Sequence, residues 1–82
     1  MNSDLKFVIE NMDRTLRINF AKSLDCTKNI FKILYEDKDP GVRKALLTNE
    51  RCPAYIIIAL RTDKDPEVSD VAKNRMSDVE VS

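Results

Sequence analysis

A repeat with a spacing of 26 residues constrains this sequence more than any other feature. The segment at 37–45, DKDPGVRKA, recurs at 63–71 as DKDPEVSDV. A weaker third copy at 11–19, NMDRTLRIN, keeps the second acidic residue, the apolar position and the arginine. A period of this size is typical of stacked helical repeats. The predicted units are residues 1–26, 27–52 and 53–75 of a single domain covering 1–75, followed by a C-terminal tail at 76–82.

Each unit is predicted to hold two short helices. The Asp-Pro pairs at 39–40 and 65–66 are helix start signals. The Asp oxygen accepts a hydrogen bond from a backbone N–H that has no partner inside the helix, and Pro at the first helical position lacks an N–H that would have had no partner there. In the first helix, Leu5, Val8, Ile9 and Met12 have the spacing of an inward face. Helices this short are marginal alone, so stacking must stabilise them. The expected helices cover about residues 4–12, 14–23, 28–35, 40–49, 53–62 and 66–75.

The fold class predicted from these elements is all-α, with six short helices in three antiparallel hairpins. The stretch from Asp37 to Pro53 reads acidic-x-Asp-Pro-x-Val-Arg-x-Ala-apolar-x-x-Asn-x-x-Cys-Pro. This pattern resembles the leucine-rich repeat variant and, more loosely, the HEAT-like repeats. The resemblance implies a right-handed, α-solenoid-like array that binds proteins or nucleic acids without catalysis.

The same resemblance implies a structural ladder between neighbouring repeats. In those families an Asp before the second helix of a repeat and an Arg within that helix form the ladder, which corresponds here to Asp37 and Arg43. The flanking copies each keep one half of the pair, with Asn11 and Arg17 in the first and Asp63 and Ser69 in the third. The resemblance therefore predicts an incomplete ladder.

Composition argues against most chemistry. The chain has no histidine, and its carboxylates cluster at helix starts, where capping explains them, so we expect no enzyme activity and no cofactor. The single glycine, Gly41, leaves no phosphate-binding loop. Cys26 and Cys52 lie one period apart and are predicted to be small buried hydrophobes, neither bridged nor metal-bound. No membrane span or leader is recognisable, so a cytoplasmic protein is expected.

A basic stripe is the basis of one functional hypothesis. Fourteen basic and fourteen acidic residues cancel, so there is no overall field to attract nucleic acid. The second helices of the first two repeats nevertheless gather Arg14, Arg17, Arg43, Lys44 and Arg51. The third copy has Ser69 and Asp70 where the second has Arg43 and Lys44, which reverses the stripe. A nucleic-acid-associated module is therefore the alternative function.

The fifth predicted helix carries the leading hypothesis. Tyr55 stands where the first two repeats have Ser3 and Asn29. Ile58 stands where they have Lys6 and Lys32, so both positions change from polar to apolar. Three interpretations are open: the tail covers this face through Met76, Val79 and Val81, the face is a patch for a partner or a second copy, or the face is left partly exposed. We expect a non-catalytic protein-binding adaptor or inhibitor with Tyr55, Ile58, Arg17, Arg43 and Lys44 as partner-binding residues. A weak homodimer through the same patch is a further expectation.

Overall fold

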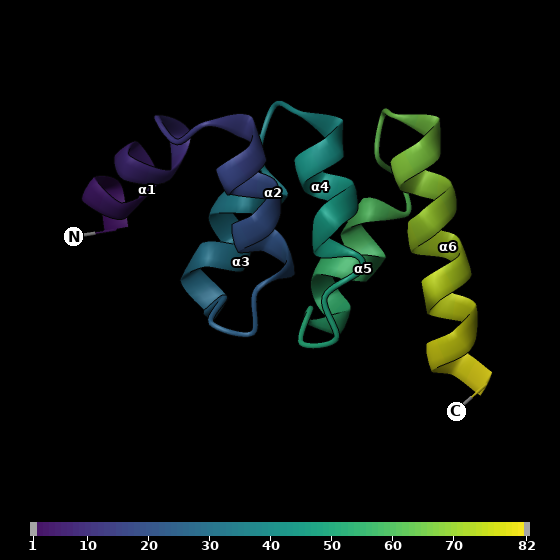
Figure 1. Ribbon diagram of the computed structural model, residues 1–82. Helices are drawn as coiled ribbons and strands as arrows, with labels where there is room; N and C mark the ends of the chain where they lie inside the picture. Colours follow the sequence, from purple (N-terminus) through teal and green to yellow (C-terminus); the bar gives the residue numbers. More distant parts are fainter. Residues whose placement is uncertain (1, 82) are drawn as a thin grey trace.

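The computed structural model describes the backbone of residues 2–81 and the side chains of residues 4–75, and this part of the chain is all-helical, without a strand. Figure 1 shows the helices in chain order. They are α1 (Asn2–Glu10), α2 (Arg14–Lys22), α3 (Lys28–Tyr35), α4 (Pro40–Leu46), α5 (Ala54–Leu60) and α6 (Pro66–Val81).

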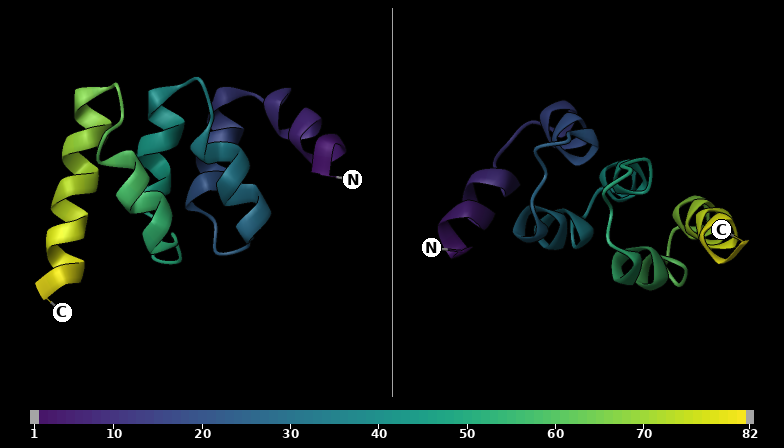
Figure 2. Two further views of the ribbon diagram at one scale, coloured as in Figure 1. Left: turned by 180° about the vertical axis from the view of Figure 1, so that it is seen from behind. Right: turned by 90° about the horizontal axis from the view of Figure 1, so that it is seen from below.

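The helices form two rows. Viewed along the helix ends, α2, α4 and α6 lie in one row and α1, α3 and α5 in the other, so the chain zigzags between the rows (Figure 2). Within the first row α2 packs on α4 and α4 on α6, while α3 packs on α4 and α5 on α6 across the rows. The molecule is elongated along the rows, with extents of 38 × 22 × 18 Å.

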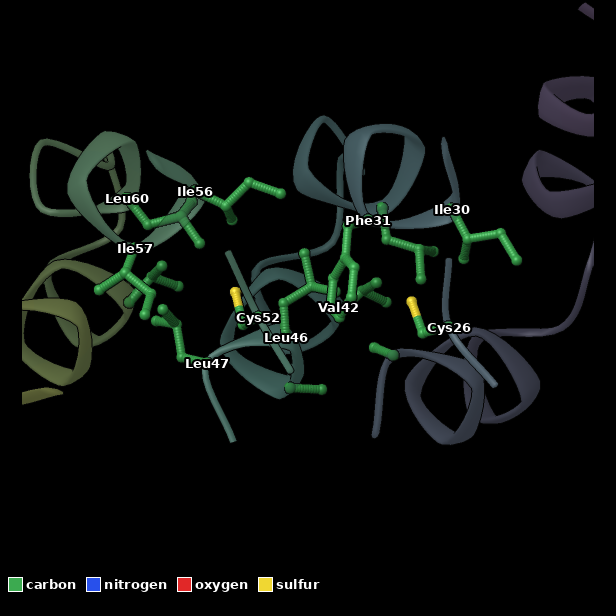
Figure 3. Packing of buried hydrophobic residues seen from close by; sticks show 14 of the residues in the cluster. Cys26, Ile30, Phe31, Val42, Leu46, Leu47, Cys52, Ile56, Ile57 and Leu60 are labelled. Carbon is green, nitrogen blue, oxygen red and sulfur yellow. The ribbon is translucent and has the colours of Figure 1, made fainter. Parts of the chain in front are cut away.

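The core fills the space between the two rows. Figure 3 shows side chains from α3, α4 and α5 meeting there, including Phe31, Val42, Leu46 and Ile57. Each of these four side chains is at most 2% exposed. The apolar 3.6-residue spacing that predicted the helices is therefore the spacing that fills the core.

The predicted Asp-Pro start signals are confirmed for α4 and α6, whereas α5 begins after Pro53 without a side-chain cap. The Asp39 carboxylate accepts a hydrogen bond from the Gly41 amide at 2.8 Å, and the Asp65 carboxylate accepts one from the Glu67 amide at 2.9 Å. Thr27 caps α3 in the same way, through the amide of Ile30. Each bond satisfies a backbone donor that has no partner inside its helix.

Two predicted boundaries need correction. The last helix does not fade near Arg75, because α6 continues as a helix to Val81. The predicted tail at 76–82 is thus largely a helical extension in the described backbone, and it shows no turn back toward α5. The side chains of Met76, Val79 and Val81, which were the candidate cap, lie outside the described residues. Helix α4 ends at Leu46, three residues before the predicted Asn49.

Helix α1 departs from the predicted inward face. Ile9 is buried at 1% exposure and Leu5 and Met12 pack on the core, but Val8 is 57% exposed. The helix packs on α3 and barely touches α2, its expected hairpin partner. The first hairpin is therefore more open than the other two.

Candidate functional site

The junction between the second and third repeats is closed by a buried ion pair. Arg43 on α4 donates from Nε to Oδ2 of Asp63 at 2.7 Å and from Nη2 to Oδ1 at 3.0 Å. Its Nη1 donates to the backbone carbonyl of Asp37 at 2.6 Å. Both side chains of the pair are only 7% exposed. Two parallel bonds between a guanidinium and a carboxylate are the strongest geometry for such a pair.

The preceding junction repeats this arrangement with a weaker geometry. Arg17 Nε lies 2.8 Å from Oδ2 of Asp37, and Arg17 Nη1 donates to the carbonyl of Met12 at 2.6 Å. The Nε–Oδ2 distance fits an ion pair, but Nε makes no hydrogen bond of acceptable angle. The charges attract at this distance regardless of the angle, so we regard the contact as an ion pair with one poorly aligned donor.

The ladder therefore pairs each arginine with the aspartate of the following repeat. Arg43 reaches Asp63 and not the carboxylate of Asp37, which differs from the pairing expected within the second copy. Because Asn11 precedes the first arginine and Ser69 follows the last aspartate, neither replacement interrupts the ladder. The described chain contains both complete rungs.

The ladder also sets the ionisation of Asp63. Burial by itself raises the pKa of this carboxyl group, but hydrogen bonds from Arg43 and from the Asp65 amide, with the charge of Arg43, outweigh burial and lower the pKa below its ordinary value. Asp63 therefore stays charged in the folded protein down to acidic pH.

The basic stripe is largely neutralised in the structure. Arg17 and Arg43 are buried in the ladder, so their guanidinium groups are not offered to a protein partner or to phosphates. Arg14 pairs with Asp39, and Lys44 pairs with Glu67, each at 2.5 Å. The Lys44 side chain remains 39% exposed, and it stays a predicted contact residue.

A second set of cross-repeat bonds escaped the sequence analysis. Asn49, only 2% exposed, donates from its amide to the carbonyls of Ala21 and Ser23 at 2.8 and 2.9 Å. One period later, Arg75 donates to the carbonyl of Leu47, the equivalent of Ala21. The available signal was a polar residue recurring at the 26-residue spacing, as Ser23, Asn49 and Arg75. These bonds satisfy carbonyls at helix ends that have no partner in their own helix.

Concavities lie at both junctions, over the ladder. One of about 240 Å³ is lined by Lys6, Glu10, Arg17, Ile33, Glu36, Asp37 and Lys38. The other, of about 540 Å³, is lined largely by the residues one period later, including Glu36, Arg43, Asp63 and Lys64. Carboxylates and cations are equally numerous in each lining. Neither concavity therefore favours an anion or a cation.

The α5 surface carries the exposed apolar pair. Tyr55 is 47% exposed and Ile58 is 45% exposed, while Ile56, Ile57 and Leu60 on the same helix are at most 2% exposed. Three buried residues thus hold the helix on the core and the other two point outward. The described residues leave the Tyr55 and Ile58 side of α5 about half exposed.

The cysteines are placed as small core residues. Cys26 and Cys52 are both buried and free, and Figure 3 shows Phe31 and Val42 between them. Burial raises the pKa of both thiols to about 11, and for Cys26 the neighbouring Cys52 adds to this effect. The described residues include no cluster of three potential metal ligands. In that same part of the chain, no helix is both long and apolar enough to cross a bilayer.

Comparisons with protein-family models, with curated proteins and with solved structures found no match to this chain. A functional assignment therefore depends on the surfaces described above.

Proposed function

We propose that this chain is a non-catalytic, cytoplasmic protein-binding module, built as a right-handed, α-solenoid-like array of three helical hairpins. The exposed pair of Tyr55 and Ile58 on α5 is its principal contact point. The observation that carries this proposal is the exposure of two large apolar side chains, three positions apart on one helix, at sites where the other repeats carry polar residues.

The energetics favour this surface over the charged ones. Burying a large apolar side chain contributes about 1.5 to 3 kcal/mol, and tyrosine is frequent among the residues that dominate protein interfaces. The buried Ile56, Ile57 and Leu60 already hold α5 on the core, so a partner would pay little to order the helix. The charges of the ladder, by contrast, are already satisfied within the chain.

An affinity capture from the native host tests the proposal. The bait is the full chain, compared with the variant Tyr55→Ser/Ile58→Lys and with Leu24→Ser as a control, since Leu24 is an exposed apolar residue in the loop after α2. The expected result is a protein that is captured by the wild type and the control but lost with the α5 variant.

Salt dependence separates this proposal from nucleic-acid binding. An apolar contact should survive added salt, whereas phosphate contacts weaken steeply. Capture that is unchanged by the α5 substitutions, or that is abolished by salt and by nuclease, would contradict the proposed function.

A further inference from the structure

Helix α1 sits one residue out of step with the repeat. The 26-residue spacing aligns Val8 with Leu34, yet the residue buried as fully as Leu34 is Ile9. The ladder shows the same shift, because Arg17 donates to a carbonyl five residues earlier in the chain and Arg43 to one six residues earlier. The register of α1 relative to α2 therefore differs by one residue from the register of α3 relative to α4.

Asn11 gives a physical reason for the shift. In the second and third hairpins, Asp37 and Asp63 each accept a hydrogen bond from the backbone amide two residues on, at 2.9 Å, which shapes the turn between the helices. Asn11 occupies the equivalent position. Its side-chain amide instead donates back to the carbonyl of Phe7 at 2.7 Å. The Asn11 backbone amide donates to the same carbonyl at 3.2 Å, so helical bonding reaches Asn11. Only residues 11–13 therefore separate α1 from α2, against 36–39 in the next hairpin.

The shift exposes both halves of a hairpin core. Val8 on α1 is 57% exposed and Leu16 on α2 is 53% exposed. Their equivalents in the second hairpin, Leu34 and Val42, are fully buried. Phe7, beside Val8, is 69% exposed. In the third hairpin the equivalents Leu60 and Val68 are each 1% exposed.

We propose that a second copy of the chain covers the open first hairpin. The Phe7 and Val8 ridge on α1 of each copy packs against Leu16 on α2 of the other copy around a two-fold axis. This surface is separate from Tyr55 and Ile58, so the proposal does not depend on the proposed function.

Complementarity within the chain indicates this occupant. In the second and third hairpins, the residues equivalent to Val8 and Leu16 are buried together in one core, as Leu34 with Val42 and Leu60 with Val68. Each copy carries both halves, but its own short connection holds them apart. A two-fold pair buries both halves at once, because each copy offers its α1 residues to the α2 residue of the other. Residues 1–26 carry four acidic and four basic side chains, so the two surfaces do not repel each other.

The other end of the array disfavours a head-to-tail filament. On α6, Asp70 takes the place that Ile18 occupies on α2 and Lys44 on α4. Ser69 replaces the ladder arginine, but it is buried and bonds to the carbonyl of Arg61 at 2.7 Å, so no ladder cation is offered to a following copy. This polar end does not match the apolar Val8 and Leu16 surface of a following copy. A closed pair is therefore the arrangement that the surface chemistry supports.

Complementary charge substitutions test the contact directly. Val8→Lys and Leu16→Glu each change an exposed residue, so both variants should keep the wild-type circular dichroism and urea midpoint. In sedimentation equilibrium from micromolar to millimolar concentration, the wild type should self-associate, and each variant alone should associate at least about tenfold more weakly. An equimolar mixture should associate again, because one of its two contacts joins Lys to Glu and the other joins the native Leu16 to the native Val8.

Two further variants complete the experiment. Asn11→Asp removes the side-chain donor to Phe7 and leaves only acceptor oxygens, as at Asp37 and Asp63, so it should favour the turn of those hairpins, close α1 on α2 and weaken self-association. Tyr55→Ser/Ile58→Lys should leave self-association unchanged, which separates this proposal from the proposed function. A wild type that is monomeric throughout the series, or folded charge variants that fail to associate when mixed, would overturn the proposal.

Discussion

Removal of Arg43 is the perturbation whose consequences follow most directly from the structure. In Arg43→Ala, Asp63 keeps a buried carboxylate, 7% exposed, without its cation, and the Asp37 carbonyl loses its donor. Breaking a buried pair from one side typically costs about 3 to 5 kcal/mol. The neighbouring substitution Lys44→Ala breaks a pair whose Glu67 side chain is 71% exposed, which costs about 0.2 to 1 kcal/mol.

Urea unfolding monitored by circular dichroism measures this difference. The free energy of unfolding of Arg43→Ala should fall several-fold further than that of Lys44→Ala. The double variant Arg43→Met/Asp63→Leu should recover much of the loss, because it removes the uncompensated charge along with the pair. Equal urea midpoints for the two single variants would refute the ladder as a source of stability.

The penalty should also depend on pH. The folded-state pKa of Asp63 is lowered, so the pair contributes fully above the unfolded pKa of about 3.9 and its contribution is lost as pH falls through the folded value. In Arg43→Ala, burial still raises the pKa of Asp63, and only the Asp65 amide bond and the charge of Lys64 remain to oppose it, so the pKa lies above its wild-type value. The variant can then protonate Asp63 at a higher pH, and the gap in stability between the two proteins should narrow on acidification. A gap that stays constant from pH 7 to pH 3 would contradict this account.

Two further predictions concern buried side chains. Asn49→Ala should lower the free energy of unfolding by about 1 to 3 kcal/mol in urea titrations, because the Ala21 carbonyl loses its donor, while the Ser23 carbonyl keeps only the Cys26 amide; an unchanged midpoint would show that water replaces the Asn49 amide without loss. Cys26 and Cys52, whose thiol pKa values are about 11, should resist alkylation at pH 8 in the native protein and react rapidly in urea, as followed by mass spectrometry; rapid labelling of the native protein would contradict their burial.

The sequence by itself determined the features that depend on nearby residues. The helix starts at Thr27, Asp39 and Asp65 were predictable because a capping side chain acts on amides only two or three positions away. The inward positions of α3 and α4 were predictable because their apolar spacing indicates the buried face directly. The pair on α5 stood out in the sequence because Tyr55 and Ile58 are apolar at repeat positions where the first two repeats have polar residues.

Tertiary structure alone decided which partners meet across the repeats. The sequence shows Asp37 and Arg43 six positions apart, but the stacking of the second helices places Arg43 beside Asp63, twenty positions away. The extension of α6 beyond Arg75 was also not predicted, because the stretch from 76 to 81 has too little apolar spacing to indicate a helix. The same stretch contains no Pro or Gly, so nothing in it ends the helix.

The register of α1 shows the physical limit most clearly. Val8 and Ile9 both fit the helical period, so local spacing cannot say which of them is buried. The folded chain buries Ile9, and α1 ends with both the backbone amide and the side-chain amide of Asn11 donating to the carbonyl of Phe7. A change of one residue in a turn thus reassigns a whole helix face, because successive positions on a helix point about 100° apart.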